Sequence, residues 1–152
     1  MNAITKYFGD INYDSKDILR APAGLFGFED RTEYLLIHFK ENDSALLCLQ
    51  SLEDENLAFV LTSPFLIIPD YQPELAEEDL KALELTEDSD VTFFAICVIR
   101  DDLQNSTVNL RCPIVINHET RAMRQVILDD TSLSFKYPLK TSAHQREEDS
   151  NC

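Results

Sequence analysis

Short apolar runs that recur at a fixed interval are the feature of this sequence that most constrains its fold. The runs at 33–39, 45–51 and 57–62 begin twelve residues apart, and the polar segments KEND and EDEN separate them. Short apolar runs joined by short polar turns predict an antiparallel meander, because parallel strands need a much longer crossover between them. Residues 91–99 (VTFFAICVI) predict another buried strand, apolar on both faces and rich in β-branched and aromatic side chains.

Residues 107–117 (TVNLRCPIVIN) alternate with a period of two, which predicts a strand with one face in a core. The residues expected on that face are Val108, Leu110, Cys112, Ile114 and Ile116. Pro113 cannot donate a backbone hydrogen bond, so the strand is expected to lie at an edge, to bend or to bulge there. Further strands are predicted near 121–128 and 132–136, and the N-terminal segment is expected to pair with a bend at Gly9.

The helical pattern is confined to about 74–84, where Ala76, Leu80 and Leu83 fall on one face. Many short strands and no βαβ spacing predict a mostly β fold, a small barrel or a sandwich. We expect a small antiparallel β-barrel-like single domain over residues 1–140, with one short helix near 74–84. Residues 141–152 (TSAHQREEDSNC) lack periodic apolar positions and predict a mobile acidic tail.

The formal net charge of the chain is −15, from 13 Lys and Arg against 28 Asp and Glu. This charge argues against direct nucleic-acid binding and against an anionic membrane surface, because both need a basic face. No apolar run approaches the roughly 18 residues of a membrane span, and the N-terminus MNAITKYFGD lacks the features of a signal peptide. We therefore expect a cytoplasmic protein, monomeric on its own because no long apolar stripe is left over.

Residues with catalytic or metal-binding potential are sparse. Cys48, Cys97 and Cys112 lie in apolar runs and are expected to be buried, whereas Cys152 is a tail thiol. The cysteines and the three histidines lack metal-ligand spacing, and the sequence has no hydrolase, metalloprotease, P-loop or dinucleotide motif. The sequence therefore predicts a non-enzymatic protein without cofactor or metal. A small-ligand barrel or an unrecognised hydrolase would need a pocket with convergent polar groups.

Acidic residues gather between Asp70 and Asp90, where nine carboxylates and a single lysine give a net charge of −8. One interpretation is a solvated helix face and turn that keep the protein soluble. The other is an electrostatic docking face for a basic protein. A calcium loop is disfavoured, because the segment lacks spaced Asx and Gly positions.

Several segments, taken together and in order, resemble the family of the flagellar assembly factor FliW. They are TKYFGDI, GLFGFED, LLCLQSLEDENLAFVLTSPF, a DYxxxL segment before the acidic helix, and TVNLRCPIVIN followed by RQVIL. The resemblance covers roughly residues 4–139. The sequence departs from the family pattern at Phe26, at Cys112 and at Ala76, which replaces a serine-like helix cap.

The resemblance implies a cytoplasmic regulator that binds flagellin and the RNA-binding translational repressor CsrA. Free protein would sequester CsrA when flagellin is scarce, and flagellin would release CsrA when it accumulates. The alternative is a flagellin-holding chaperone without a translational role.

Ten residues are candidates for partner binding: Gln50, Ser51, Phe65, Asp70, Tyr71, Glu77, Glu78, Asp79, Asn109 and Asn117. Gln50 and Ser51 end a strand, where Gln50 would be either a cap of the strand ladder or a partner contact. Each asparagine would either close a turn with its side chain or face a partner. Tyr71 is expected to anchor a partner, so that Tyr71→Ala weakens binding more than folding, whereas Phe65 fits a core position better.

Overall fold

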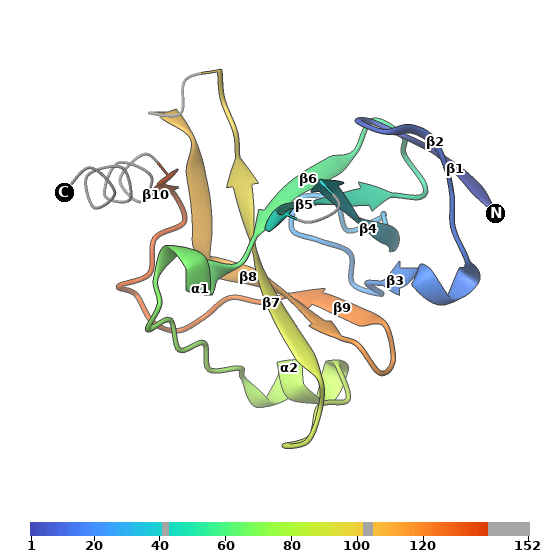
Figure 1. The fold of residues 1–152 in the computed structure, drawn as a ribbon. Helices are drawn as coiled ribbons and strands as arrows, with labels where there is room; N and C mark the ends of the chain where they lie inside the picture. The colour runs from blue at the N-terminus through green and yellow to red at the C-terminus, as the bar shows by residue number, and fades with distance from the viewer. Residues whose placement is uncertain (41–42, 102–104, 140–152) are drawn as a thin grey trace.

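The computed structural model describes residues 1–40, 43–101 and 105–139. The predicted tail at 141–152 lies outside the described residues. Strands account for most of the regular structure (Figure 1). In chain order the elements are β1 (Asn2–Thr5), β2 (Gly9–Asn12), the 3-10 helix η1 (Ser15–Asp17), β3 (Leu19–Arg20), β4 (Glu33–Lys40), β5 (Asp43–Ser51), β6 (Ala58–Thr62), α1 (Pro64–Ile67), α2 (Glu77–Ala82), β7 (Val91–Val98), β8 (Thr107–Asn117), β9 (Ala122–Gln125) and β10 (Tyr137–Pro138).

Seven strands close into a barrel. The hydrogen-bonded order is β8-β7-β6-β5-β4-β3-β9, and β9 returns to β8. All of these pairs are antiparallel except β3 with β9, where Arg20 lies opposite Ala122 in a parallel bridge. The expected meander is confirmed in β4, β5 and β6, and the barrel rather than the sandwich is confirmed by the closing pair. Closure leaves no strand of this set at the open edge of a sheet, although β3 contributes only short pairings to β4 and β9.

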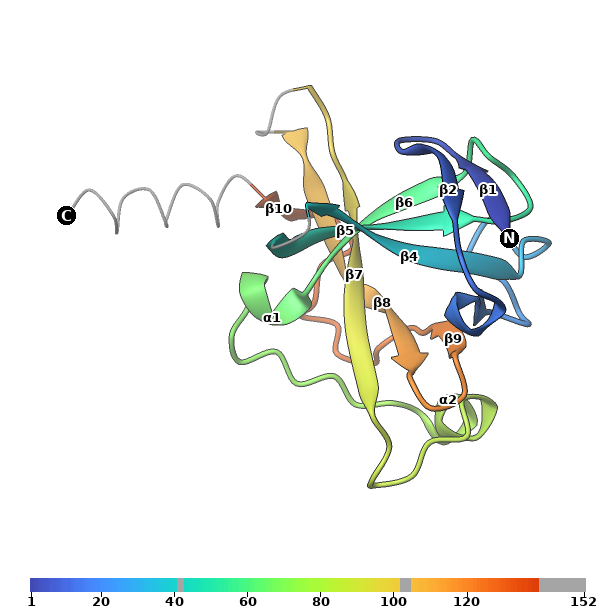
Figure 2. The ribbon, with the colours of Figure 1, turned by 45° about the vertical axis from the view of Figure 1, so that its right-hand side comes forward.

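Two apolar clusters hold the fold together. The first fills the barrel and draws on β3 to β9, with Tyr34, Leu49, Leu61, Ile114, Ile116 and Met123 among its members. The second lies on the outer face of β7 and β8, beneath α1, α2 and the segment after β9 (Figure 2). Its members include Tyr71, Leu83, Ala95, Cys97, Val108, Leu110, Val115 and Leu128. The barrel therefore has an internal core and an external one, and the external core places the acidic segment.

A bulge in β8 confirms the irregularity expected at Pro113. The register between β7 and β8 shifts beside this residue. The Asn109 side chain holds the bulge, because its Oδ1 accepts hydrogen bonds from the backbone N–H groups of Arg111 (3.2 Å) and Cys112 (2.9 Å). The structure thus gives Asn109 the backbone-closing role that was one of its two interpretations.

The same bulge corrects the expected face of β8. Val108 and Leu110 pack in the external core, whereas Ile114 and Ile116 pack inside the barrel. A strict period of two would place all four on one face. Extra residues at a bulge shift the phase of the alternation, so each half of β8 serves a different core.

The predicted helix is shorter than expected and turns a different face inward. Helix α2 covers Glu77–Ala82. Leu83 is buried as expected, but Ala76 and Leu80 are exposed, and Asp79 is the second inward side chain. The hydrophobic pattern predicted the wrong inward face for α2. Asp79 can be buried there because it forms an ion pair with Arg124. The second helix, α1, was not predicted.

Some expectations for the shorter elements and the cysteines are confirmed and others are wrong. The N-terminal pairing is confirmed as the β1–β2 hairpin, with Gly9 at φ +66°. The strand expected at 132–136 is wrong, since β10 forms at Tyr137–Pro138, and β9 ends at Gln125 rather than near 128. Cys48, Cys97 and Cys112 are buried free thiols, as expected, and Cys152 lies outside the described residues.

Gly24 offers a direct test of the turn before β4. Its φ is +69°, and a Cβ there would lie 2.4 Å from the Glu29 Cα. Gly27 has φ +86° but open space around its Cβ position. Gly24→Ala is therefore expected to lower the free energy of unfolding by about 3 kcal/mol, against about 1 kcal/mol for Gly27→Ala. Urea unfolding of both variants measures the difference, and equal losses would contradict the close approach.

Candidate partner-binding surface

Two polar tethers fix the acidic helix α2 on the barrel. At its first turn, Asp79 is 6% exposed, and its Oδ1 accepts a hydrogen bond of 2.7 Å from the Arg124 Nε of β9. At its end, the Asn117 side chain of β8 donates from Nδ2 to the Leu83 carbonyl oxygen at 2.8 Å. The Oδ1 of Asn117 also accepts from the Glu119 N–H at 3.0 Å, which closes the following turn. These tethers orient the other acidic side chains of the segment toward solvent.

The remaining eight carboxylates between residues 70 and 90 are exposed. They are Asp70, Glu74, Glu77, Glu78, Glu84, Glu87, Asp88 and Asp90. The segment runs from α1 past α2 along the outside of β7 and β8 (Figures 1 and 2). We call these eight residues the acidic face. Four of the predicted partner-binding residues are carboxylates of this segment: Asp70, Glu77, Glu78 and Asp79. All but the buried Asp79 are available to a partner.

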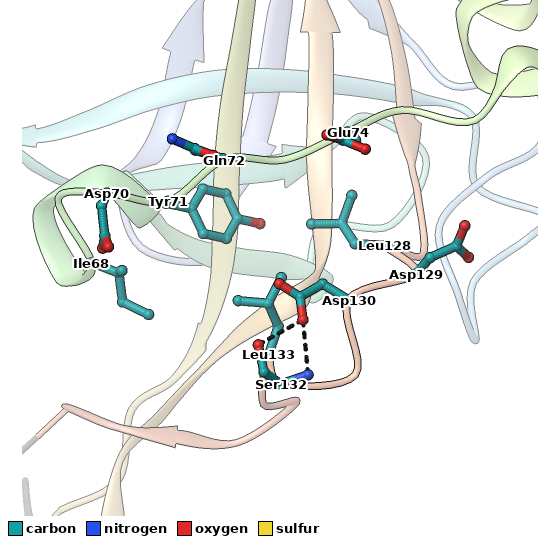
Figure 3. A pocket seen from close by; sticks show the side chains of 10 residues that line it. All are labelled: Ile68, Asp70, Tyr71, Gln72, Glu74, Leu128, Asp129, Asp130, Ser132 and Leu133. Carbon is teal, nitrogen blue, oxygen red and sulfur yellow. Dashed lines mark hydrogen bonds between the residues drawn. The ribbon is translucent and has the colours of Figure 1, made fainter.

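A cleft of about 500 Å³ opens at one end of the acidic face. Residues from the α1–α2 connection form one wall, and residues that follow β9 form the other (Figure 3). Its carboxylates are Asp70, Glu74, Asp129 and Asp130, and its apolar side chains include Ile68, Leu128 and Leu133. Asp130 is fixed by hydrogen bonds from the Ser132 N–H (3.0 Å) and Oγ (2.6 Å), which hold its pKa below the ordinary value. The cleft combines negative charge with apolar contact area.

Tyr71 lies at the inner side of this cleft and belongs to the external core. It is 5% exposed, and its hydroxyl donates a hydrogen bond of 2.6 Å to the Leu110 carbonyl oxygen. Burial raises the pKa of its phenol to about 12. Phe65 packs edge-on against Tyr71 at 5.6 Å between ring centroids, yet it is 41% exposed. The expectations for the two rings are therefore reversed: Tyr71 is the core residue and Phe65 the exposed one.

Gln50 and Ser51 are buried and serve the interior of the fold. The Gln50 Oε1 accepts a hydrogen bond of 2.9 Å from the Lys6 N–H, and its Nε2 donates to carbonyl oxygens of the β5–β6 turn. The Ser51 Oγ accepts from the N–H groups of Glu53 and Asp54, both at 3.1 Å. Gln50 thus caps the strand ladder and fastens the N-terminal hairpin. Neither side chain is available to a partner at the surface.

The ten candidate residues therefore do not form one site. Gln50, Ser51, Tyr71, Asp79 and Asn117 are buried and bonded within the fold. Phe65, Asp70, Glu77 and Glu78 are exposed and belong to α1, to α2 or to the segment that joins them, whereas Asn109 belongs to β8. Sequence reasoning missed Asp129 and Asp130, which complete the acidic cleft. Their adjacency in ILDDTS is visible in the sequence, but only the fold brings them opposite Asp70.

No helix in the described part of the chain is long and apolar enough to cross a membrane. The family model described as FliW protein matches residues 2–139. The chain belongs to the FliW family. The resemblance inferred from the sequence motifs is thereby confirmed, and with it a role in flagellar assembly.

Individual FliW relatives agree along almost their whole length. The flagellar assembly factor FliW of Ruminiclostridium cellulolyticum is 36% identical over 143 residues, which is 94% of this chain and 97% of the relative. That of Clostridium tetani is 37% identical over 139 residues, which is 91% of this chain and 95% of the relative. A crystal structure of the flagellar assembly factor FliW superposes with a TM-score of 0.84 at 34% identity, covering 91% of this chain and 96% of that one. The barrel is the FliW fold.

Proposed function

We propose that this chain is a cytoplasmic, non-enzymatic regulator of flagellar assembly that binds flagellin and the translational repressor CsrA in exchange. Free protein holds CsrA away from flagellin mRNA, and accumulated flagellin releases CsrA by occupying the regulator. Family membership supports the flagellar role. The single observation that supports a CsrA-type partner is the acidic face, which a basic protein would complement.

The electrostatic argument follows from the chemistry of RNA binding. A protein that binds RNA presents cations to the phosphates, so its surface is basic. The acidic face and the cleft beside it offer many exposed carboxylates to such a surface, within a chain of net charge −15. The same negative field repels RNA from the complex. The protein therefore competes with RNA for its partner without contacting RNA itself.

The partner exchange is tested by size-exclusion chromatography with light scattering on three mixtures: the protein with CsrA, with flagellin, and with both. We expect the protein to form a complex with CsrA, and we expect added flagellin to dissociate that complex. Binding to flagellin but not to CsrA would replace the proposal with its alternative, a flagellin-holding chaperone. Binding to neither would overturn both. The protein alone is expected to elute as a monomer.

Neutralising the acidic face is expected to weaken CsrA binding. Asp70→Asn with Asp129→Asn, on opposite walls of the cleft, should raise the Kd for CsrA about fivefold at low salt, because each exposed pair contributes about 0.5 kcal/mol. Glu77→Gln with Glu78→Gln should act in the same direction. The effect should shrink as salt screens the charges. Isothermal titration at two salt concentrations measures both quantities.

A matched control is available in the β1–β2 hairpin and the β5–β6 turn. Asp10→Asn with Glu55→Gln removes the same number of exposed charges far from α2. Its Kd for CsrA should stay within about twofold of the unaltered protein, since only the net charge changes. If the control pair weakened binding as much as the cleft pair, the acidic face would not be the docking surface.

A further inference from the structure

A second groove opens where β7 ends and β8 begins. Figure 1 shows that this end of the two strands projects from the rest of the barrel. It has a volume of about 370 Å³. Its described lining residues come from β7, from β8, from the connection between these two strands and from the segment before β10: Ile96, Val98, Arg100, Asn105, Thr107, Asn109, Phe135 and Lys136. Asn109, one of the predicted partner-binding residues, therefore reaches a surface groove after all, although its Oδ1 is used within β8.

The floor of this groove is apolar and continues the barrel interior toward solvent. Ile96 lies opposite Asn109 and Val98 opposite Thr107, so these side chains share one face of the β7–β8 ribbon. Ile96 also packs against the barrel core, while Val98 is 48% exposed. Apolar side chains that stay exposed next to a core mark a surface that another chain can cover.

The wall formed by Phe135 is fixed in place, although its ring is 52% exposed. The Arg111 guanidinium lies over that ring at 5.4 Å from its centroid, and the Arg111 Nε donates to the Leu128 carbonyl oxygen at 2.9 Å. The Leu110 N–H donates to the Ser134 carbonyl oxygen at 3.0 Å. These bonds bind the segment before β10 to β8, so the groove is formed before any partner arrives and costs little ordering on binding.

Among the described residues that line the groove, the charged ones are two cations, Arg100 and Lys136. Within the described residues neither makes an ion pair, whereas Arg20, Arg31 and Arg124 each contact a carboxylate. Asp101 follows Arg100 in the chain but does not line the groove. Arg100 and Lys136 thus place two positive charges beside an apolar floor in a chain of net charge −15. They complement carboxylates on whatever covers the floor.

We propose that this groove docks an apolar protein segment that carries carboxylate side chains. The apolar side chains of the segment would cover Ile96, Val98 and Phe135, and its carboxylates would pair with Arg100 and Lys136. The inference goes beyond the proposed function, because it concerns a surface of apolar and positively charged side chains rather than the carboxylates of the acidic face. It makes the protein a two-surface binder, with one surface for basic chains and another for acidic, apolar ones.

Labelled peptides test the groove by fluorescence anisotropy at physiological salt. The probes are a peptide of repeated Leu-Leu-Glu-Glu, one of Leu-Leu-Gln-Gln and one of Ser-Ser-Glu-Glu. The net charge of the protein repels the glutamate peptides, so binding of Leu-Leu-Glu-Glu reports a local complementary site rather than general attraction. We expect Leu-Leu-Glu-Glu to bind more tightly than Leu-Leu-Gln-Gln and Ser-Ser-Glu-Glu not to bind.

Variants then locate the binding. Arg100→Glu with Lys136→Glu should weaken Leu-Leu-Glu-Glu binding about tenfold and leave Leu-Leu-Gln-Gln unchanged, since two attractions become repulsions. Val98→Ser should weaken both leucine peptides severalfold. Lys16→Glu with Lys81→Glu makes the same charge change elsewhere and should have less than about twofold effect. Circular dichroism melts confirm that each variant is folded.

The proposal is overturned if the unaltered protein does not bind Leu-Leu-Glu-Glu, or if the groove variants and the Lys16–Lys81 control behave alike. Amide NMR shifts confined to residues that neither line the groove nor adjoin its lining residues in the chain would also overturn it. CsrA and flagellin binding are measured on the same variants. Retained binding of both proteins alongside lost peptide binding would leave the proposed function intact, so the two proposals can fail separately.

Discussion

Replacing Tyr71 by alanine is expected to lower the free energy of unfolding by about 4 kcal/mol. The side chain is 5% exposed and joins the external core between β8 and the acidic segment. Removing it leaves a cavity beneath the α1–α2 connection and leaves the Leu110 carbonyl oxygen without its 2.6 Å hydrogen bond. Urea unfolding measures the loss. A loss below about 1 kcal/mol, with weakened partner binding, would restore Tyr71 as a partner anchor.

Phenylalanine at the same position separates packing from hydrogen bonding. Tyr71→Phe keeps the ring and is expected to cost about 1.5 kcal/mol, because a buried carbonyl loses its donor. Burial raises the pKa of Tyr71 from 10.0 to about 12. The contribution of the phenol is therefore complete below pH 10 and is lost as the pH rises through 12. The stability difference between the protein and Tyr71→Phe should narrow over that interval.

Phe65 is the matched control for the ring. It packs against Tyr71 and Phe93 but is 41% exposed. Phe65→Ala should therefore cost less than half of what Tyr71→Ala costs, since less apolar area leaves the core. The sequence favoured the opposite assignment, because FLII reads as an apolar run and DYQP as a polar one. Tyr71 follows Asp70 in the chain and is nevertheless buried, because the external core lies beneath this polar segment.

The strands were predictable because their pattern is local. Periodic apolar runs and short turns indicate β4 to β8 without any knowledge of partners, and Pro113 marks the bulge from its missing N–H. Barrel closure was less accessible, since the parallel bridge between Arg20 and Ala122 joins two very short strands. The shift in the alternation of inward and outward side chains along β8 depends on the number of extra residues in the bulge, which residue types do not encode.

The candidate surface was predictable in charge but not in arrangement. The excess of acids between residues 70 and 90 is evident in the sequence, and most of them are exposed. The cleft also needs Asp129 and Asp130, which are far away in the chain. Gln50 and Ser51 were candidates because they end a strand within a family motif, and Asn117 because asparagine is unfavourable in strands. Gln50 and Asn117 bond to backbone groups distant in the chain, whereas Ser51 bonds to backbone groups two and three residues ahead.

Breaking the Asp79–Arg124 pair is expected to be the second large effect. The Asp79 side chain is 8% exposed and that of Arg124 30%. Removing Arg124 therefore leaves a carboxylate with little water to solvate it, whereas removing Asp79 leaves a guanidinium that water partly solvates. Arg124→Ala should lower the free energy of unfolding by about 3 kcal/mol, because it leaves the more buried charge unpaired, and Asp79→Ala by about 2 kcal/mol. The double variant should lose much less than their sum, because the second deletion removes the orphaned charge.

These two single variants and the double variant form a double-mutant cycle. An ion pair at the surface provides the comparison for its coupling energy. Arg20 and Glu33 lie 3.6 Å apart, with side chains 57% and 42% exposed. The coupling energy of that pair should be about 0.5 kcal/mol or less, against about 2 kcal/mol for Asp79 with Arg124. Urea unfolding of the variants in both double-mutant cycles measures the two coupling energies. Equal coupling would mean that the burial of Asp79 does not strengthen the tether, and that the apolar contacts of Leu83 hold α2 on the barrel instead.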